Sequence, residues 1–154
     1  MKKILTMFGL VAVLTLAMNI TVAAQAPIRV FVDGVEVIFP DQAPVLQDGR
    51  VLVPVRGVFE QLGFYVRWDE ENEEVLLDGV NVNFYSIRIP VGYRHFTTIT
   101  SAAAHIRYLD VPAQLIGGRT MVPIRLPLES AGFVMEWYEE DRFVIIWSRR
   151  LIHN

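Results

Sequence analysis

Hydrophobic and polar residues alternate along two short runs between Ile28 and Phe39. Strict alternation is typical of a β-strand that buries one face. Asp33-Gly34 separates the runs, and this pair favours a type I′ turn, which needs positive φ at both central residues. We therefore predict an antiparallel hairpin over this stretch. Asp48-Gly49 is a second turn signal, and it predicts a short strand pair or an irregular crossing over residues 45–53.

The period changes at Pro54, which suits the first turn of a helix because its missing N–H is no loss there. Gly63 follows the apolar stripe and can supply the left-handed cap. The pattern predicts a helix over residues 54–62, too short to be stable unless it packs on a sheet. Alternation then resumes over residues 64–68 and predicts a strand and hairpin. The helical spacing i, i+3, i+4, i+7 is carried by Val55, Val58, Phe59 and Leu62.

Residues 48–77 recur, with a shift of 69 positions and no gap, as residues 117–146. A repeat of this length must be recognised before any fold is assigned. We predict an α+β fold of two tandem ββ(β)αββ pseudo-repeats, about 27–90 and 91–148, with antiparallel sheets each packed on one short helix. Pro127 stands where the first copy has Val58, so the second helix should start later or be shorter. The shared residue types include Gly49/Gly118, Arg50/Arg119, Pro54/Pro123, Arg56/Arg125, Glu60/Glu129, Gly63/Gly132 and Trp68/Trp137.

The first 26 residues have the pattern of a secretory signal peptide. Two lysines precede an apolar run, and small residues follow it at the positions that a signal peptidase requires, so that cleavage after Ala24 or after Ala26 fits. We expect a secreted, extracellular protein, associated with the cell wall, whose only membrane contact would be through this peptide if it stayed uncleaved.

The amino-acid composition excludes several classes of functional site. The chain has no cysteine, which excludes disulfides, thiolate metal sites and a cysteine nucleophile. Because both lysines lie in the signal peptide, the 14 basic residues fall to 12 arginines against 17 carboxylates, a net charge of 12 − 17 = −5 after cleavage. The arginines are scattered along the sequence, so a basic stripe for nucleic acid is not predicted.

The chain resembles the copper amine oxidase N-terminal-like domain, which occurs in secreted and wall-associated bacterial proteins. The resemblance is carried by the Asp-Gly hairpin, the lead-ins 41–44 and 110–114, the turns 48–50 and 117–119 with the Val-Pro-x-Arg that follows, and the later Glu, Gly and Trp of each copy. It covers nearly all of the chain after the signal peptide in two passes. It implies an antiparallel sheet wrapped around a helix, with no catalytic residues of its own.

The oxidase chemistry of the family's name is not expected here. That chemistry needs a quinone-forming tyrosine in an Asn-Tyr-Asp/Glu context and three convergent histidines. The nearest tyrosine stretch is 83–86, and His95, His105 and His153 show no paired spacing. The acidic turn 69–74 lacks the spacing and glycine of a calcium loop. We therefore predict no enzyme activity, no catalytic residue, no metal and no cofactor.

The shared residues are interpreted as structural: Arg56, Glu60, Arg125, Glu129, Gly63, Gly132, Trp68 and Trp137. Each arginine and glutamate lie at i, i+4, where they can pair on their own helix. The alternative makes Glu60 and Glu129 the acid–base pair of a wall-active hydrolase. The tryptophans are in phase with apolar neighbours, which favours core packing over a platform for sugars.

We expect a binding surface at residues that the two copies do not share. The stretch 91–107 carries Tyr93, His95 and Phe96, and Tyr65 and Tyr138 are expected to face solvent. The leading hypothesis is a secreted, non-catalytic binding or structural module at the bacterial envelope that contacts a wall polymer or an extracellular protein. Two alternatives to this hypothesis remain: the wall-active hydrolase described above and a free-standing spacer module.

Overall fold

The computed structural model describes residues 25–79 and 85–148, which form thirteen strands and two helices. The pattern of residues 80–89 predicts a further extended stretch. The start of this stretch and almost all of the predicted signal peptide lie outside the described ranges. No helix within the described ranges is long and apolar enough to span a bilayer. The elements are β1 (Arg29–Val32), β2 (Val35–Glu36), β3 (Val45–Gln47), β4 (Arg50–Pro54), α1 (Val55–Gln61), β5 (Phe64–Asp69), β6 (Glu74–Gly79), β7 (Ser86–Pro90), β8 (His95–Ile99), β9 (Ala104–Tyr108), β10 (Gln114–Ile116), β11 (Arg119–Pro123), α2 (Arg125–Ser130), β12 (Phe133–Tyr138) and β13 (Phe143–Ser148).

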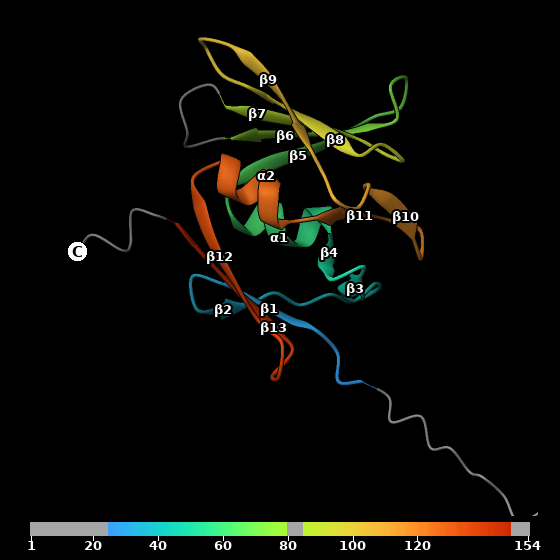
Figure 1. Cartoon of the computed structure of the whole chain (residues 1–154), viewed down its shortest axis with the longest axis vertical. Helices are drawn as coiled ribbons and strands as arrows, with labels where there is room; N and C mark the ends of the chain where they lie inside the picture. The colour runs from blue at the N-terminus through green and yellow to red at the C-terminus, as the bar shows by residue number, and fades with distance from the viewer. Residues whose placement is uncertain (1–24, 80–84, 149–154) are drawn as a thin grey trace, which may run out of the picture.

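The strands form three sheets around the two helices. Their orders are β12-β13-β1-β2, β10-β11-β4-β3 and β5-β6-β7-β8-β9. Figure 1 shows α1 and α2 in the middle of the molecule, between the five-stranded sheet and the sheet that holds β1 and β13. The molecule is thus mostly β-sheet with two short helices, which confirms the α+β class.

Both predicted Asp-Gly turns form. Asp33 and Gly34 have φ of 48° and 82°, and Asp48 and Gly49 have φ of 49° and 71°. β1 pairs antiparallel with β2 and β3 with β4 across these turns. Positive φ at both central residues is the type I′ condition that the sequence predicted.

The two helices differ as Pro127 predicted. α1 has seven residues, whereas α2 has six and begins one position later relative to the repeat. Pro127 therefore stands in the first turn of α2, where it removes no helical hydrogen bond. Val55, Val58 and Phe59 of α1 are buried, so the helix is held by the sheets around it.

Gly132 ends α2 with φ of +87°, and a Cβ built there would meet no atom within 4 Å. The cost of Gly132→Ala is therefore expected to come from the backbone alone, about 1–2 kcal/mol of unfolding free energy. Chemical denaturation measures it. Gly132→Asn is the matched control and should cost less, because asparagine tolerates the left-handed region. Equal costs for the two variants would contradict this explanation.

The central sheet joins equivalent strands of the two sequence copies. The bounds of β3, β4, β5 and β6, shifted by 69, are those of β10, β11, β12 and β13. β4 and β11 pair antiparallel, and their register places Val53 opposite Val122, which are themselves equivalent residues. Two positive-φ residues, Glu73 (50°) and Arg142 (53°), also correspond.

The prediction that each copy would own an antiparallel sheet is wrong in one respect. β1 pairs parallel with β13, from Arg29 opposite Phe143 to Val32 opposite Ile146. The first hairpin therefore completes a sheet of the second copy, whereas β6 pairs with β7 and the sheet continues through β8 and β9. Alternation identifies a strand and its buried face, but it does not identify the neighbour.

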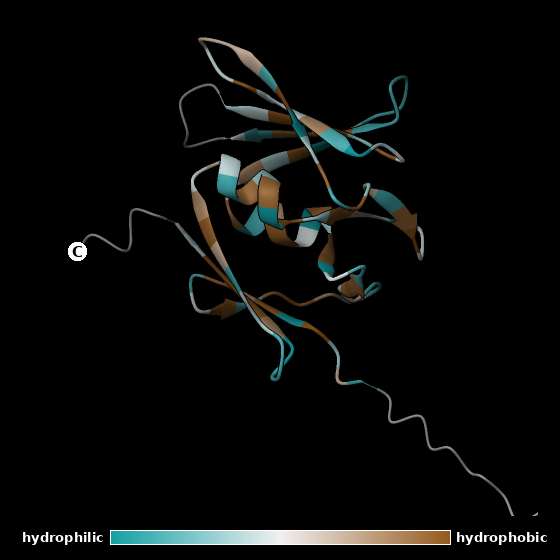
Figure 2. Cartoon of the chain, in the orientation of Figure 1, coloured by the Kyte–Doolittle hydropathy of each residue, from teal (hydrophilic) through white to brown (hydrophobic). Residues whose placement is uncertain are grey.

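One apolar core spans both copies. It includes Val30, Phe59 and Leu77 from the first copy and Leu128 and Ile146 from the second, none of them more than 1% exposed. Figure 2 shows apolar colour on the inner strands and helices, and hydrophilic colour at the ends of the hairpins β5–β6 and β12–β13. The acidic turn of the first of these hairpins is exposed to solvent at residues 70–73.

Candidate functional site

One surface pocket lies where a turn of one copy meets the helix start of the other. Its cavity is about 490 Å³, within the range of small-molecule sites. We call it the Trp137 pocket. It is lined by Gly49, Arg50, Val51, Leu109, Asp110, Pro123, Ile124, Arg125, Leu126, Met135 and Trp137.

The second pocket, which we call the Trp68 pocket, has a cavity of about 320 Å³. It too joins a glycine-arginine turn to a helix start and a tryptophan, with the copies exchanged. It is lined by Pro54, Val55, Arg56, Val66, Arg67, Trp68, Val75, Gly118, Arg119 and Thr120.

The two pockets use the same positions of the repeated stretch. Shifted by 69, eight of the ten residues lining the Trp68 pocket line the Trp137 pocket, and Arg67 and Val75 are the two that do not. Each pocket needs both copies, because its turn arginine comes from one copy and its helix arginine from the other. The shared arginines and tryptophans are therefore brought together in a way that their linear order does not reveal.

The turn arginines are fixed by crossed ion pairs. Arg50 contacts Asp110 at 2.6 Å, and Arg119 pairs with Asp41. Both aspartates begin the lead-in segments, so each pair links one copy to the other. All four side chains are about half exposed, and such pairs contribute about 0–1 kcal/mol to stability. Their main effect is to position a guanidinium at each pocket.

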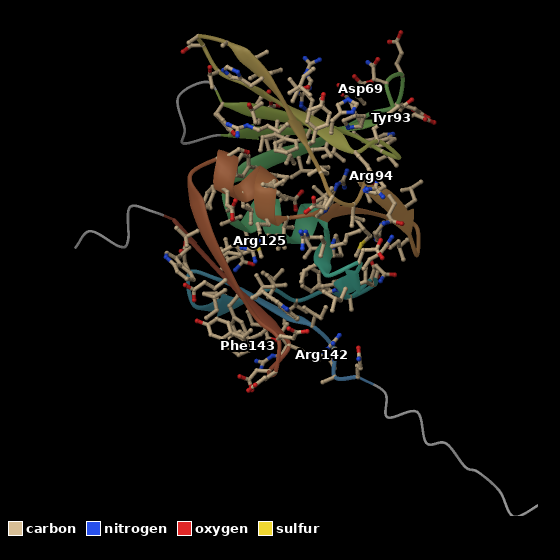
Figure 3. The ribbon with its side chains drawn as sticks, viewed as in Figure 1. Asp69, Tyr93, Arg94, Arg125, Arg142 and Phe143 are labelled. Carbon is tan, nitrogen blue, oxygen red and sulfur yellow. The ribbon has the colours of Figure 1, made fainter. Side chains whose placement is uncertain are left out.

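The helix arginines differ in their partners. Arg125 lies 3.5 Å from Glu129 on its own helix, as the i, i+4 spacing predicted. Arg56 forms no ion pair within 4.0 Å with any residue of the described ranges, so the expected pair with Glu60 is absent from them. Figure 3 places Arg125 at α2 in the middle of the molecule.

The tryptophans were both expected in the core, and Trp68 is not. It is 42% exposed, although Phe64 and Val66 on the same face of β5 are buried. Its phase is correct, but it lies near the end of β5, next to the exposed turn of residues 70–73. Trp137 is half-buried and packs against the core. Both indoles border a pocket.

The two copies differ in charge at one equivalent position of β5 and β12. Arg67 lines the Trp68 pocket and donates to Asp78 at 2.6 Å. This hydrogen bond raises the pKa of the Arg67 guanidinium. The equivalent residue of the second copy is Glu136, whose carboxylate accepts a hydrogen bond from the Tyr138 hydroxyl at 2.6 Å and thereby raises the pKa of that phenol.

The predicted binding surface does not form one patch. Tyr65 and Tyr93 are exposed (62% and 61%), but Phe96 is fully buried, which is a correction. It points to the core side of β8, where alternation puts every second residue. Tyr138 stacks on Phe143, far from Tyr93 at the other end of the molecule (Figure 3). His95 is half-buried beside Tyr93, with ring centroids 5.7 Å apart.

The stretch 91–107 forms most of the hairpin β8–β9 at the edge of the five-stranded sheet. Neither pocket is lined by a residue of this stretch. The two pockets are lined instead by residues that the two copies share, which the sequence suggested were scaffold.

The pockets hold cations and apolar surface rather than an acid–base pair. Glu60 and Glu129 are exposed on the helices and are absent from the lining of both cavities as described. The one lining carboxylate of the Trp137 pocket, Asp110, is bound to Arg50. Within residues 25–79 and 85–148, no three histidine, aspartate or glutamate side chains gather as metal ligands.

Comparison with known proteins agrees with the motifs. Residues 31–146 match the copper amine oxidase N-terminal domain, and the chain belongs to this family. A Brevibacillus choshinensis protein named "Protease inhibitor" is 30% identical over 127 residues, which are 80% of this chain and 37% of that protein. The chain thus spans little more than a third of that relative. No solved structure matches the chain. The family is that of the N-terminal domain of the oxidase, without its catalytic part.

Proposed function

We propose that this chain is a secreted, non-catalytic binding module that works at the bacterial cell envelope. Its ligand is a wall polymer or an extracellular protein, and the contact is made through the Trp68 and Trp137 pockets. Secretion is supported by the lysine-led apolar leader and its small-residue cleavage positions.

The observation that carries the proposal is the pair of pockets built from the same positions. Each offers guanidinium groups beside an indole and an apolar wall, a combination suited to recognition. Hydrolysis of a glycosidic bond needs two carboxyl groups flanking the substrate, and the described lining of the pockets offers only Asp110. The relative named "Protease inhibitor" supports the version with a protein partner.

We also propose that the fold consists of two pseudo-repeats, about residues 27–90 and 91–148. The coincident strand bounds, the matching positive-φ residues and the eight corresponding pocket positions support this organisation. The crossed pairs Arg50–Asp110 and Arg119–Asp41 support it further, since their members also correspond.

A sedimentation assay with purified cell walls tests the function. We expect the chain without its leader to sediment with the walls, and the variant Trp68→Ala/Trp137→Ala to be retained several-fold less. A cysteine-free protein of similar size and acidity serves as the control for trapping. Retention of a specific extracellular protein without retention on walls would select the protein partner. If neither is retained, the chain is a spacer and the binding module is wrong.

A further inference from the structure

The Trp68 pocket has a positive lining that the Trp137 pocket does not share. Its described lining contains Arg56, Arg67 and Arg119 and no carboxylate. The Trp137 pocket contains two arginines and Asp110. Because the protein as a whole is acidic, with a net charge of −3 at pH 7, a local group of three guanidiniums is an unusual feature of its surface.

Two of these three cations are already engaged. Arg67 donates to Asp78 at 2.6 Å, and Arg119 pairs with Asp41. Arg56 is exposed and makes no ion pair with a described residue. A guanidinium offers several donors in a fixed plane, which match a carboxylate or a phosphate. An anion that enters the pocket would therefore be bound first by Arg56.

The remaining lining suits a ring that carries the anion. Trp68 is 42% exposed and lines the pocket, and Thr120, the second residue of β11, adds a polar residue to the lining. Flat apolar surface beside polar groups is how proteins fix the orientation of a small ligand. The cavity of about 320 Å³ is near the lower limit of small-molecule sites, which favours one charged ring over a peptide segment.

We infer that the Trp68 pocket is a subsite for an anionic sugar residue of a polymer, with Arg56 bound to its carboxylate or phosphate and Trp68 against its ring. The inference rests on the proposed function and names the ligand of one of its two pockets. The Trp137 pocket, where Arg125 is held by Glu129 and Arg50 by Asp110, is not a site for the anion.

Binding of soluble probes tests the subsite. The probes are a polyuronate, a polymer of sugar phosphates, neutral dextran and poly-glutamate, and affinity is measured by calorimetry at low and at physiological salt. The variant is Arg56→Gln, and the control is Arg88→Gln, which removes an exposed arginine of β7 that lines neither pocket. Thermal unfolding confirms that both variants fold, which is expected because both side chains are exposed.

We expect the polyuronate, the phosphate polymer or both to bind, more weakly at higher salt, and dextran and poly-glutamate not to bind. Arg56→Gln should weaken binding about tenfold, the loss of one charge-assisted hydrogen bond, and Arg88→Gln should weaken it less than about twofold. Preference between the two anionic polymers identifies the charged group.

Absence of binding by both anionic polymers, equal binding of poly-glutamate, or equal effects of the two variants would overturn the inference. The wall assay separates this failure from that of the proposed function. If the Arg56→Gln variant sediments with walls as well as the unaltered chain does, the module still binds and only the subsite is wrong. If the unaltered chain binds neither walls nor a protein, both proposals are wrong.

Discussion

Replacement of Phe59 by alanine is expected to lower the free energy of unfolding by about 3–5 kcal/mol, the usual cost of removing a buried aromatic ring from a core. The Phe59 side chain is fully buried on α1, and its ring meets that of Phe64 edge to face at 5.6 Å. Because α1 lies between sheets, the cavity left by the ring cannot be filled by solvent or by a flexible loop.

Urea denaturation followed by tryptophan fluorescence measures this loss. Tyr65→Ala is the control, since Tyr65 is 62% exposed on the adjoining strand, and exposed substitutions usually change stability by less than about 0.5 kcal/mol. Similar losses for the two variants would show that α1 is not packed as described.

The first proposed repeat is expected not to fold by itself. A chain of residues 27–90 lacks β11, the partner of β4, and β13, the partner of β1. It also lacks Val122, Leu128 and Ile146 from the shared core. A chain of about 60 residues buries too little surface to tolerate such losses.

Circular dichroism during a urea titration tests this expectation. Residues 27–90 should show no cooperative transition, whereas residues 27–148 should show one. Addition of residues 91–148 to the first fragment should restore the sheet signal. A sigmoidal transition of the first fragment alone would mean that each repeat is an independent domain.

Local features of this fold were predictable because they depend on neighbours in sequence. The Asp-Gly turns and the glycine after each helix could be predicted because these residues tolerate the positive φ that such positions require. The later start of α2 could be predicted from Pro127. The partners of the strands were not predictable in this way. The parallel pairing of β1 with β13 depends on residues more than a hundred positions apart.

The candidate site was predictable only in its parts. The repeat identified Arg50, Arg119, Trp68 and Trp137 as shared, but shared residues suggested scaffold, and the scattered arginines suggested no basic site. Their convergence depends on the antiparallel pairing of β4 with β11, which brings the turn of each copy to the helix of the other. The phase of Trp68 was correct, yet phase does not show where the core ends along a strand.

The pairing of Val53 with Val122 has a consequence for the symmetry of the molecule. Contacts in which residue i of one half meets residue j of the other, and j meets i, are isologous, the type that identical subunits form in a two-fold dimer. Here β4 and β11 meet in this manner within one chain, and both valines are fully buried. A residue at such an axis faces its own counterpart, so an enlarged side chain introduced in both halves would collide with its own copy. Val53 and Val122 therefore share one buried space between β4 and β11.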